Sequence, residues 1–471
     1  MGRTFAEVLV ENYDDVTLHE TGRGRGRKIR KAERQEDTRP DGPAEFRAQV
    51  EAFSEFGKAT RVLAFPAPDF NLPVYVNEFW TARQRAAHPL HEISYRACFK
   101  PQLPRFFITR LTRPGETVYD PFMGRGTTVL EAALLGRRPM GCDINPLSRI
   151  LILPRLDPPE LCEVRERLSG LDLARAVEAW DDLLVFYHPD TLRELINLRA
   201  HLLDRAASGS LDHVDAWIRM VATNRLTGHS PGFFSVYTLP PNQAVSLVSQ
   251  RRINERRGQS PPRRDVRALI LRKSRALLKG LSADEAARLR AAARDALLLT
   301  ASCERTPQIA DESVALVVTS PPFLDTVDYQ GDNWLRCWFN GIEAAGVRVW
   351  KVSGLAQWQD RMRAVFQELH RILAPGGHVA FEVGEVRKGQ VLLETLVVPA
   401  AASAGLTPLM VLVNDQVFTK TSHCWGVDNL RRGTNTNRIV VLRKPGMRIP
   451  RRGCPTGDSV ASQAGGNGWL A

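Results

Sequence analysis

The chain has 471 residues, which is long enough for two or three globular domains. Its share of 43% hydrophobic and 25% charged residues is typical of globular proteins. Its 64 lysines and arginines exceed its 52 acidic residues, and the resulting net charge of +12 favours a polyanionic partner. Because no apolar run could span a bilayer and the seven cysteines form no CxxC pair, we expect a cytoplasmic protein without membrane segment, disulfide framework or metal site.

Both ends of the chain are expected to lie outside the folded core. Residues 1–60 are predicted to form a basic, mobile extension, because the run Thr21–Lys31 holds glycine, arginine and lysine but almost nothing to bury. Such a run can contact phosphates, although it is more often only a solvated tail. Residues 448–471 are rich in glycine, proline, arginine and serine and are expected to be disordered.

Residues 61–150 carry the first part of an α/β pattern. The helix predicted at Arg105–Leu111 is followed by a short apolar strand that ends at Asp120, a turn containing two glycines, and a helix-forming stretch. A second short strand ends at Asp143. A glycine turn after a parallel strand lets a ligand approach the backbone, and a carboxylate about 20 residues later can bind ribose hydroxyls. The missing third glycine argues against NAD, so the pattern predicts another nucleoside cofactor.

Residues 151–294 interrupt the α/β pattern with an insertion that is mainly helical and far longer than ordinary loops. Thr191–Glu194 has the capping-box pattern of a helix start. The loop Asn224–Tyr237 and the paired arginines after it combine basic, amide and aromatic side chains, which suit contacts to phosphates and base edges. The plainer alternative is a charged helical face and a loop that packs on its own domain. The candidate nucleic-acid-binding residues are Asn224, Arg225, His229, Arg251, Arg252, Arg256, Arg257, Arg263 and Arg264.

Residues 295–447 resume the α/β pattern. Val314–Thr319 predicts a buried parallel strand, and it is followed directly by Ser320-Pro321-Pro322-Phe323. Two prolines cannot continue a strand, so they should form a stiff turn at its carboxyl end. A serine hydroxyl and a free carbonyl there could accept hydrogens from an amino group on a planar ring, and Phe323 could stack on that ring. The four residues of this turn are therefore the candidate catalytic residues.

Residues just after this turn could line a pocket for the planar ring, although each one alone is more often structural. The candidates for this base pocket are Asp325, Asp328, Tyr329, Asn333 and Trp334. A helix over 355–373 and strands over 378–383, 409–418 and 437–443 would complete the sheet.

Two of these motifs resemble those of one family. Asp120–Thr128 resembles the cofactor motif of amino-group DNA methyltransferases that use S-adenosylmethionine, and Lys100 resembles the start of the segment that opens their cofactor pocket. Thr319–Phe323 resembles their catalytic motif, in the Ser-Pro-Pro-aromatic form typical of enzymes that methylate the N4 amine of cytosine. The resemblance covers about 80–150 and 295–445 and implies a Rossmann-like α/β fold with a mixed, seven-stranded, mostly parallel sheet. The insertion would then be the target-recognition region.

The resemblance implies S-adenosylmethionine as cofactor, double-stranded DNA with a flipped base as substrate, and a restriction or phage-defence partner. The candidate cofactor-binding residues are Lys100, Asp120, Pro121, Phe122, Gly124, Gly126, Thr127, Thr128, Asp143, Ile144, Asn145, Ser302 and Thr319. Ser302 departs from the family pattern, because an acidic residue often stands there to bind the adenine.

Three alternatives remain open at this point. Adenine-N6 enzymes share the chemistry but more often carry Asp or Asn before the two prolines. RNA guanine-N2 methyltransferases share both turns, yet they usually carry an RNA-binding domain that this chain does not show. A non-catalytic nucleic-acid-binding module could also have kept the fold. Methylation at carbon 5 of a pyrimidine would need a nucleophilic cysteine just after a proline, and the chain has no Pro-Cys dipeptide.

Overall fold

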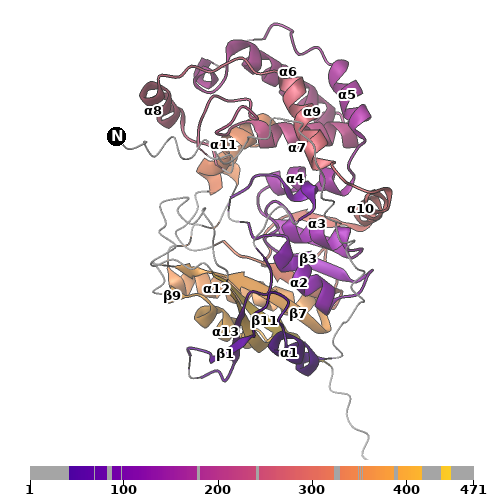
Figure 1. Cartoon of the computed structure of the whole chain (residues 1–471), viewed down its shortest axis with the longest axis vertical. Helices are drawn as coiled ribbons and strands as arrows, with labels where there is room; N and C mark the ends of the chain where they lie inside the picture. Colours follow the sequence, from indigo (N-terminus) through magenta and orange to yellow (C-terminus); the bar gives the residue numbers. More distant parts are fainter. Residues whose placement is uncertain are drawn as a thin grey trace, which may run out of the picture.

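A nine-stranded mixed sheet forms the base of the fold (Figure 1). The computed structural model describes residues 42–67, 69–81, 87–96, 98–177, 181–239, 243–322, 329–347, 350, 352, 354–386, 391–415 and 436–446. The strand order is β1 (Arg61–Ala64), β2 (Pro73–Asn77), β10 (Thr407–Asp415), β11 (Thr436–Arg443), β7 (Leu373–Val383), β6 (Val314–Thr319), β3 (Thr117–Asp120), β4 (Arg138–Asp143) and β5 (Leu297–Thr300). The pairs β1–β2, β10–β11 and β11–β7 are antiparallel, and the other pairs are parallel.

Strands β3 and β6 lie side by side at the centre of the sheet although the insertion separates them in sequence. Val118 pairs with Leu316 and Tyr119 with Val317, in parallel. From β3 the chain continues to β4 and β5 on one side, whereas it continues from β6 to β7 on the other. Ligands of open α/β sheets bind at the carboxyl ends of the strands where the order reverses in this way. The fold therefore predicts a binding site beyond the ends of β3 and β6.

Helices bury both faces of the sheet, which explains the nearly continuous apolar sequence of its central strands. Val118 and Leu316 face a core shared with α1 (Pro43–Glu51) and α2 (Gln102–Leu111). Tyr119 and Val317 face the opposite core, shared with α12 (Leu355–Ile372) and α13 (Glu394–Ser403). Alternate side chains of one strand thus belong to different cores, as the two-residue period of a strand requires.

The insertion forms a helical layer at the other end of the molecule (Figure 1). It contains α4 (Leu147–Leu156), α5 (Leu161–Ser169), η3 (Asp181–Val185), α6 (Pro189–Ala207), α7 (His213–Arg225), α8 (Leu247–Arg257), α9 (Val266–Leu277) and α10 (Ala283–Asp295). Its apolar core is continuous with α3 (Thr127–Leu134) and α11 (Tyr329–Asn340), so the insertion is built onto the α/β part rather than attached by a linker. The remaining elements are η2 (Pro89–His91), η4 (Ala344–Gly346), β8 (Glu385–Val386) and β9 (Val391–Leu392).

Two expectations from the sequence need correction. The sheet has nine strands rather than seven, because the segment before the cofactor motif adds β1 and β2 beside β10. The predicted extension of residues 1–60 also ends too late, since Phe46 and Val50 of α1 are buried in the core. Residues 1–41, which include the Gly/Arg/Lys run, and the tail from 447 lie outside the described residues.

The described part of the chain holds neither a membrane-spanning helix nor a cluster of metal-binding side chains. None of its helices is both long and apolar enough to cross a membrane. Within the same residues, no group of three or more His, Cys, Asp or Glu side chains is arranged to hold a metal ion.

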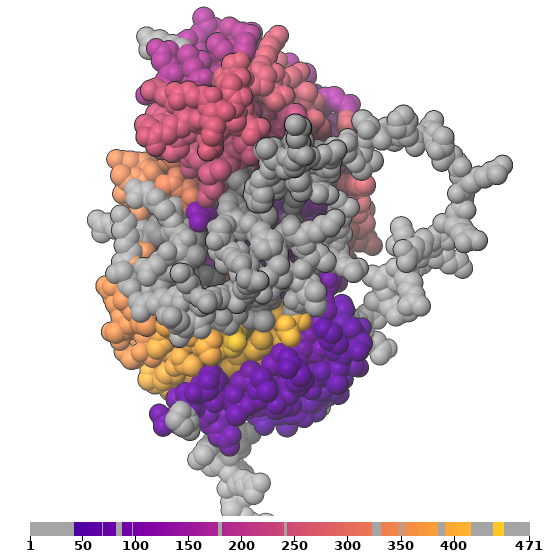
Figure 2. Space-filling model, turned by 60° about the vertical axis from the view of Figure 1, so that its left-hand side comes forward, coloured from indigo at the N-terminus to yellow at the C-terminus, as the bar shows by residue number. Residues whose placement is uncertain are grey.

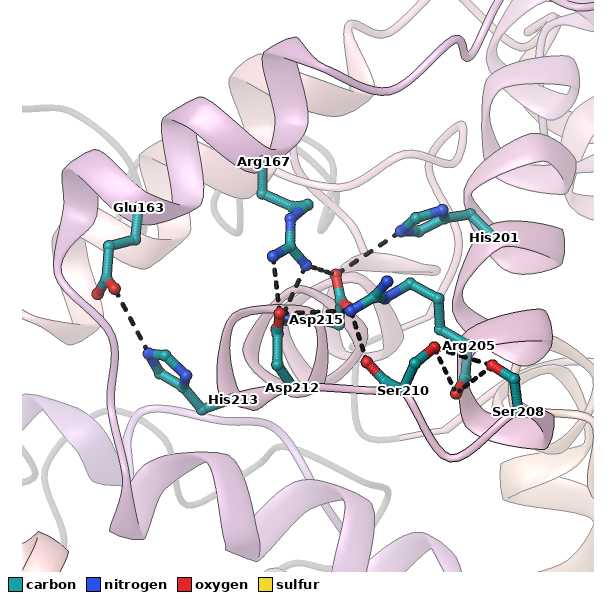
Figure 3. Close-up of polar contacts among 9 residues, drawn as sticks. All are labelled: Glu163, Arg167, His201, Arg205, Ser208, Ser210, Asp212, His213 and Asp215. Carbon is teal, nitrogen blue, oxygen red and sulfur yellow. Dashed lines mark hydrogen bonds and ion pairs between the residues drawn. The ribbon is translucent and has the colours of Figure 1, made fainter.

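A buried carboxylate holds three helices of the insertion together (Figure 3). Asp215 of α7 is fully buried and pairs with Arg167 of α5 and Arg205 of α6. Asp212, the N-cap of α7, accepts a second bond from Arg167 at 2.7 Å and one from the Asp215 backbone N–H at 2.9 Å. Asp212 also pairs with Arg205 at 3.4 Å, so two carboxylates compensate two guanidinium groups. Removing the buried Asp215 would leave one carboxylate between two positive charges.

We predict that Asp215→Ala lowers the free energy of unfolding by about 3 kcal/mol, the usual cost of removing one partner from a buried ion pair. The matched control is Asp190→Ala, which removes an exposed pair with Arg193 on α6 and should cost less than about 1 kcal/mol. Urea unfolding followed by circular dichroism measures both values. Equal effects of the two substitutions would contradict the role of Asp215.

Candidate active site

A cavity of about 860 Å³, counting its open mouth, lies at the carboxyl ends of β3, β4 and β6. Residues of both sequence motifs border it. Its lining consists of Tyr95, Arg96, Cys98, Phe99, Asp120, Pro121, Phe122, Met123, Gly124, Thr127, Asp143, Ile144, Asn145, Ala301, Cys303, Ser320, Pro322 and Trp350.

The turn between β3 and α3 needs glycine at two positions. Gly124 and Gly126 have φ angles of 47° and 76°, which other residues adopt only with strain. A Cβ atom on Gly126 would also lie 2.4 Å from Cγ1 of Ile152, closer than atoms can pack. The turn therefore keeps its backbone exposed to the cavity at Gly124, where a ligand can approach it closely.

Asp143, at the end of β4, fixes this turn. Its Oδ2 accepts the N–H of Gly124 at 2.8 Å, and its Oδ1 accepts the N–H of Asn145 at 2.8 Å. Burial raises the pKa of this carboxyl, while the two N–H groups oppose the rise. Each oxygen has room for a second hydrogen bond, so the carboxylate can still accept hydroxyl groups from the cavity side.

Asp120 links the cofactor turn to the catalytic turn. Its Oδ1 accepts the hydroxyl of Thr319 on β6 at 2.6 Å and the N–H of Phe122 at 3.1 Å. Burial raises the pKa of Asp120 to about 7, against the effect of these hydrogen bonds. A carboxyl at the end of one strand thus binds a hydroxyl at the end of the next, and the two motifs meet at one rim of the cavity.

Ser320 borders the cavity beside a buried acidic group. Its hydroxyl is hydrogen-bonded to Glu382 of β7, which also accepts the side-chain amide of Asn437 on β11. Burial raises the pKa of Glu382 to about 7, although both hydrogen bonds favour the charged form. The indole N–H of Trp358 donates to the Pro322 carbonyl at 3.1 Å and holds the proline turn in place.

Five of the thirteen candidate cofactor residues do not line the cavity: Lys100, Gly126, Thr128, Ser302 and Thr319. Thr128 donates its hydroxyl to the Val318 carbonyl at 3.0 Å, and Thr319 donates to Asp120. Ser302 donates to Glu304 at 3.0 Å, while its neighbours Ala301 and Cys303 line the cavity. Burial lowers the pKa of Lys100, as does the nearby charge of Arg125. These residues support the wall and its field.

Asn333 and Trp334, the two base-pocket candidates whose side chains are described, do not line this cavity. Asn333 is buried and accepts a hydrogen bond from Arg336 at 2.9 Å, and Trp334 donates to the Val245 carbonyl at 3.1 Å. Both lie on α11, whose apolar side joins the core of the insertion. Tyr329 begins that helix. The base-pocket candidates Asp325 and Asp328, and the candidate catalytic residue Phe323, lie outside the described residues.

The candidate nucleic-acid-binding residues fall into two environments. Asn224 is buried and donates to the Ser94 carbonyl at 3.1 Å, so it supports the structure instead of facing solvent. Arg225 lies 4.0 Å from the ring centre of Phe233, and the ring of His229 is near the same phenyl group. Arg264 is half-buried. The other members, Arg251, Arg252, Arg256, Arg257 and Arg263, are exposed, with Arg257 stacked 3.9 Å from the ring centre of Tyr237.

Several residues of the site belong to no recognisable sequence motif. Tyr95 and Cys98 come just before the predicted Lys100, and only their proximity to it could have pointed to them. Trp350 packs edge-on against Phe122 at a ring separation of 5.7 Å, but no motif surrounds it. Glu382 stands in an apolar strand, and a lone acidic residue in a buried strand was the available signal.

Residues 47–149 match the family model described as DNA methylase, whose members act on N6 or N4 amines. This match covers less than a quarter of the chain. Two curated relatives are the Type II methyltransferases M.MjaII of Methanocaldococcus jannaschii, 30% identical over 89 residues, and M.MvaI of Kocuria varians, 31% identical over 117 residues. The matches cover 19% and 24% of this chain and 16% and 24% of the relatives, so the methylase likeness spans a quarter or less of each relative's length.

The type II methyltransferase M.BsoBI of Geobacillus stearothermophilus is similar to the same extent, with 30% identity over 119 residues, covering 21% of this chain and 23% of the relative. Among solved structures, TrmN from Thermus thermophilus aligns over 77% of this chain and 52% of its own with 14% identity and a TM-score of 0.29. A score this low carries no weight, so the fold is defined from its own strand order.

We predict that Asp143→Ala weakens the binding of S-adenosylmethionine by at least about 10-fold, because the substitution removes an acceptor for ribose hydroxyls and loosens the Gly124 turn. Isothermal titration calorimetry measures the dissociation constant. The control is Asp157→Ala, an exposed carboxylate on the insertion that pairs with Arg290. Wild-type affinity in a folded Asp143→Ala protein would remove Asp143 from the cofactor site.

Proposed function

We propose that this chain is a site-specific DNA methyltransferase that transfers a methyl group from S-adenosylmethionine to the exocyclic N4 amine of cytosine. The observation that carries the proposal is the cavity shared by Gly124 and Asp143 on one side and Ser320 on the other. The methylase family region and the Type II relatives support DNA as the substrate. Adenine N6 is the alternative acceptor, because the family model covers both amines.

The cavity residues suit the cofactor. Asp143 would accept the ribose hydroxyls, Gly124 leaves the backbone open, and Ile144 offers an apolar surface to the adenine. When it is bound, S-adenosylmethionine supplies an electrophilic methyl group on a positively charged sulfur. The aromatic pair Phe122 and Trp350 would exclude water from that side of the site.

Ser320 would orient the acceptor amine. Because its hydroxyl donates to Glu382, the lone pairs of its oxygen remain available to accept an N–H of the amine. The hydrogen bond from the amine to Ser320 would draw the lone pair of the nitrogen out of conjugation with the ring. Catalysis would depend mainly on positioning this nitrogen against the methyl group. The nitrogen gains a methyl group and must lose one proton. Ser320 can pass that proton to Glu382, whose pKa of about 7 suits a base at neutral pH.

The cytosine assignment depends on the serine before the two prolines, where adenine enzymes of the resembled family more often have Asp or Asn. The test is methylation of DNA from a methylation-free host with deuterated methyl donor, followed by digestion and mass spectrometry of the nucleosides. We expect labelled N4-methylcytosine. Labelled N6-methyladenine would establish the alternative, and unlabelled DNA from a protein that binds the cofactor would contradict the proposal.

We predict that Ser320→Ala reduces kcat by at least about 100-fold while the dissociation constant of S-adenosylmethionine changes less than about 2-fold. The reason is that the hydroxyl contacts the acceptor and not the ribose side of the cavity. Ser302→Ala is the matched control, since its hydroxyl bonds Glu304 and Ser302 does not line the cavity. Full turnover by Ser320→Ala would refute the assigned role.

We predict that the rate of the wild-type protein rises with pH through about 7, as Glu382 loses its proton, and that Glu382→Gln flattens this rise. Its raised pKa also affects folding. The folded state holds this proton more tightly than the unfolded state, so the stabilisation is present below the ordinary value of 4.5 and lost as pH rises through 7. Pre-steady-state rates and unfolding free energies from pH 5 to 9 measure both effects. An unchanged pH profile in Glu382→Gln would assign the titration to Asp120 instead.

A further inference from the structure

Three basic side chains converge on the loop that follows α7. Arg225 ends α7, and Arg272 and Lys273 lie on α9. A Cβ atom on Gly232 of the loop would meet Nη2 of Arg272 at 3.3 Å and Nη1 of Arg225 at 4.0 Å. The two guanidinium groups therefore lie close to the same glycine, and no side chain stands between them and its Cα atom.

The charges in this cluster are held close together. Burial and, to a lesser extent, the positive charge of Arg225 lower the pKa of Lys273 to about 8, although the charge of Glu92 acts in the opposite direction. Within the described part of the chain, no carboxylate forms an ion pair with Arg272 or Lys273. Like charges in a partly desolvated place are costly unless an anion binds between them.

The geometry of the donors suits a phosphate group. Phe233 holds the guanidinium of Arg225 by stacking, and the carbonyl of Pro231 accepts a hydrogen bond from Arg272 at 3.3 Å. Both groups are thus fixed before any ligand arrives. Planar guanidinium groups with fixed orientation bind phosphate oxygens in pairs, and the hydroxyl of Ser230 lies beside Gly232 as a further donor.

The cluster is joined directly to the wall of the cavity. Asn224, the residue before Arg225, donates to the carbonyl of Ser94, and Arg336 of α11 donates to the same carbonyl at 3.1 Å. Ser94 is followed by Tyr95 and Arg96, which line the cavity. A group bound at the cluster would therefore have a fixed position relative to the active site.

We propose that Arg225, Arg272 and Lys273 bind one backbone phosphate of the DNA substrate and so set the position of the strand whose extruded base enters the cavity. The inference rests on the proposed function and specifies where its substrate is held. Phosphate contacts determine register and orientation and carry no sequence information, so the cluster acts on every DNA sequence alike. Its contribution is electrostatic and falls with salt.

The test compares the salt dependence of duplex DNA binding in wild type, Arg272→Gln and Lys273→Met. Fluorescence anisotropy between 50 and 200 mM salt measures the binding constant. Each variant should bind the duplex about 10-fold more weakly than wild type at 100 mM salt. Its slope of log K against log salt should be smaller than that of wild type by about 1, the effect of one phosphate. The control is Arg290→Gln on α10, an exposed arginine paired with Asp157, which should retain the wild-type slope. Cofactor affinity should be unchanged in all variants.

Several outcomes separate this inference from the proposed function. If wild type methylates DNA but the two variants keep its slope and affinity, the phosphate site is wrong while the function stands. If wild type neither binds nor methylates DNA, the proposed function itself fails. Inorganic phosphate that binds at micromolar concentration without altering the DNA slope would assign a free-anion site and overturn the inference. Tighter binding of duplex RNA than of DNA in the same assay would also contradict it.

Discussion

The site depends on one hydrogen bond, 2.6 Å long, from the Thr319 hydroxyl to the Asp120 carboxylate. The two residues are 199 positions apart in the sequence. The hydrogen bond joins the ends of two adjacent parallel strands, and each strand delivers one motif. Residues of the glycine turn and of the Ser-Pro-Pro turn line the same cavity. In the proposed reaction, the first turn would hold the methyl donor and the second would hold the acceptor amine.

The insertion is part of this arrangement rather than an addition to it. Its core extends to α3 and to Tyr95 and Met123, which also line the cavity. A substrate held by the insertion would therefore be positioned by the same packed structure that forms the pocket wall. The buried pairs of Asp215 keep three of its helices in a fixed arrangement, which a recognition surface requires.

Much of the site could be predicted from sequence because its elements are local. The strand, turn and helix around Gly124 and the proline turn after Thr319 each follow from short patterns. Side chains that meet only through folding could not be predicted: Trp350 and Glu382 reach the site from distant segments. The capping box expected at Thr191 was wrong, since α6 begins at Pro189 with His188 as its N-cap and Thr191 instead bonds the Arg264 carbonyl. Strands β1 and β2 were missed because strands of four and five residues carry little pattern.

The most direct test of the central claim is a crystal structure of the chain with S-adenosylhomocysteine. The account predicts that the ribose hydroxyls contact the Asp143 carboxylate and that the sulfur faces Ser320 across the cavity. A ligand bound elsewhere, or one whose sulfur points away from the Ser-Pro-Pro turn, would contradict it.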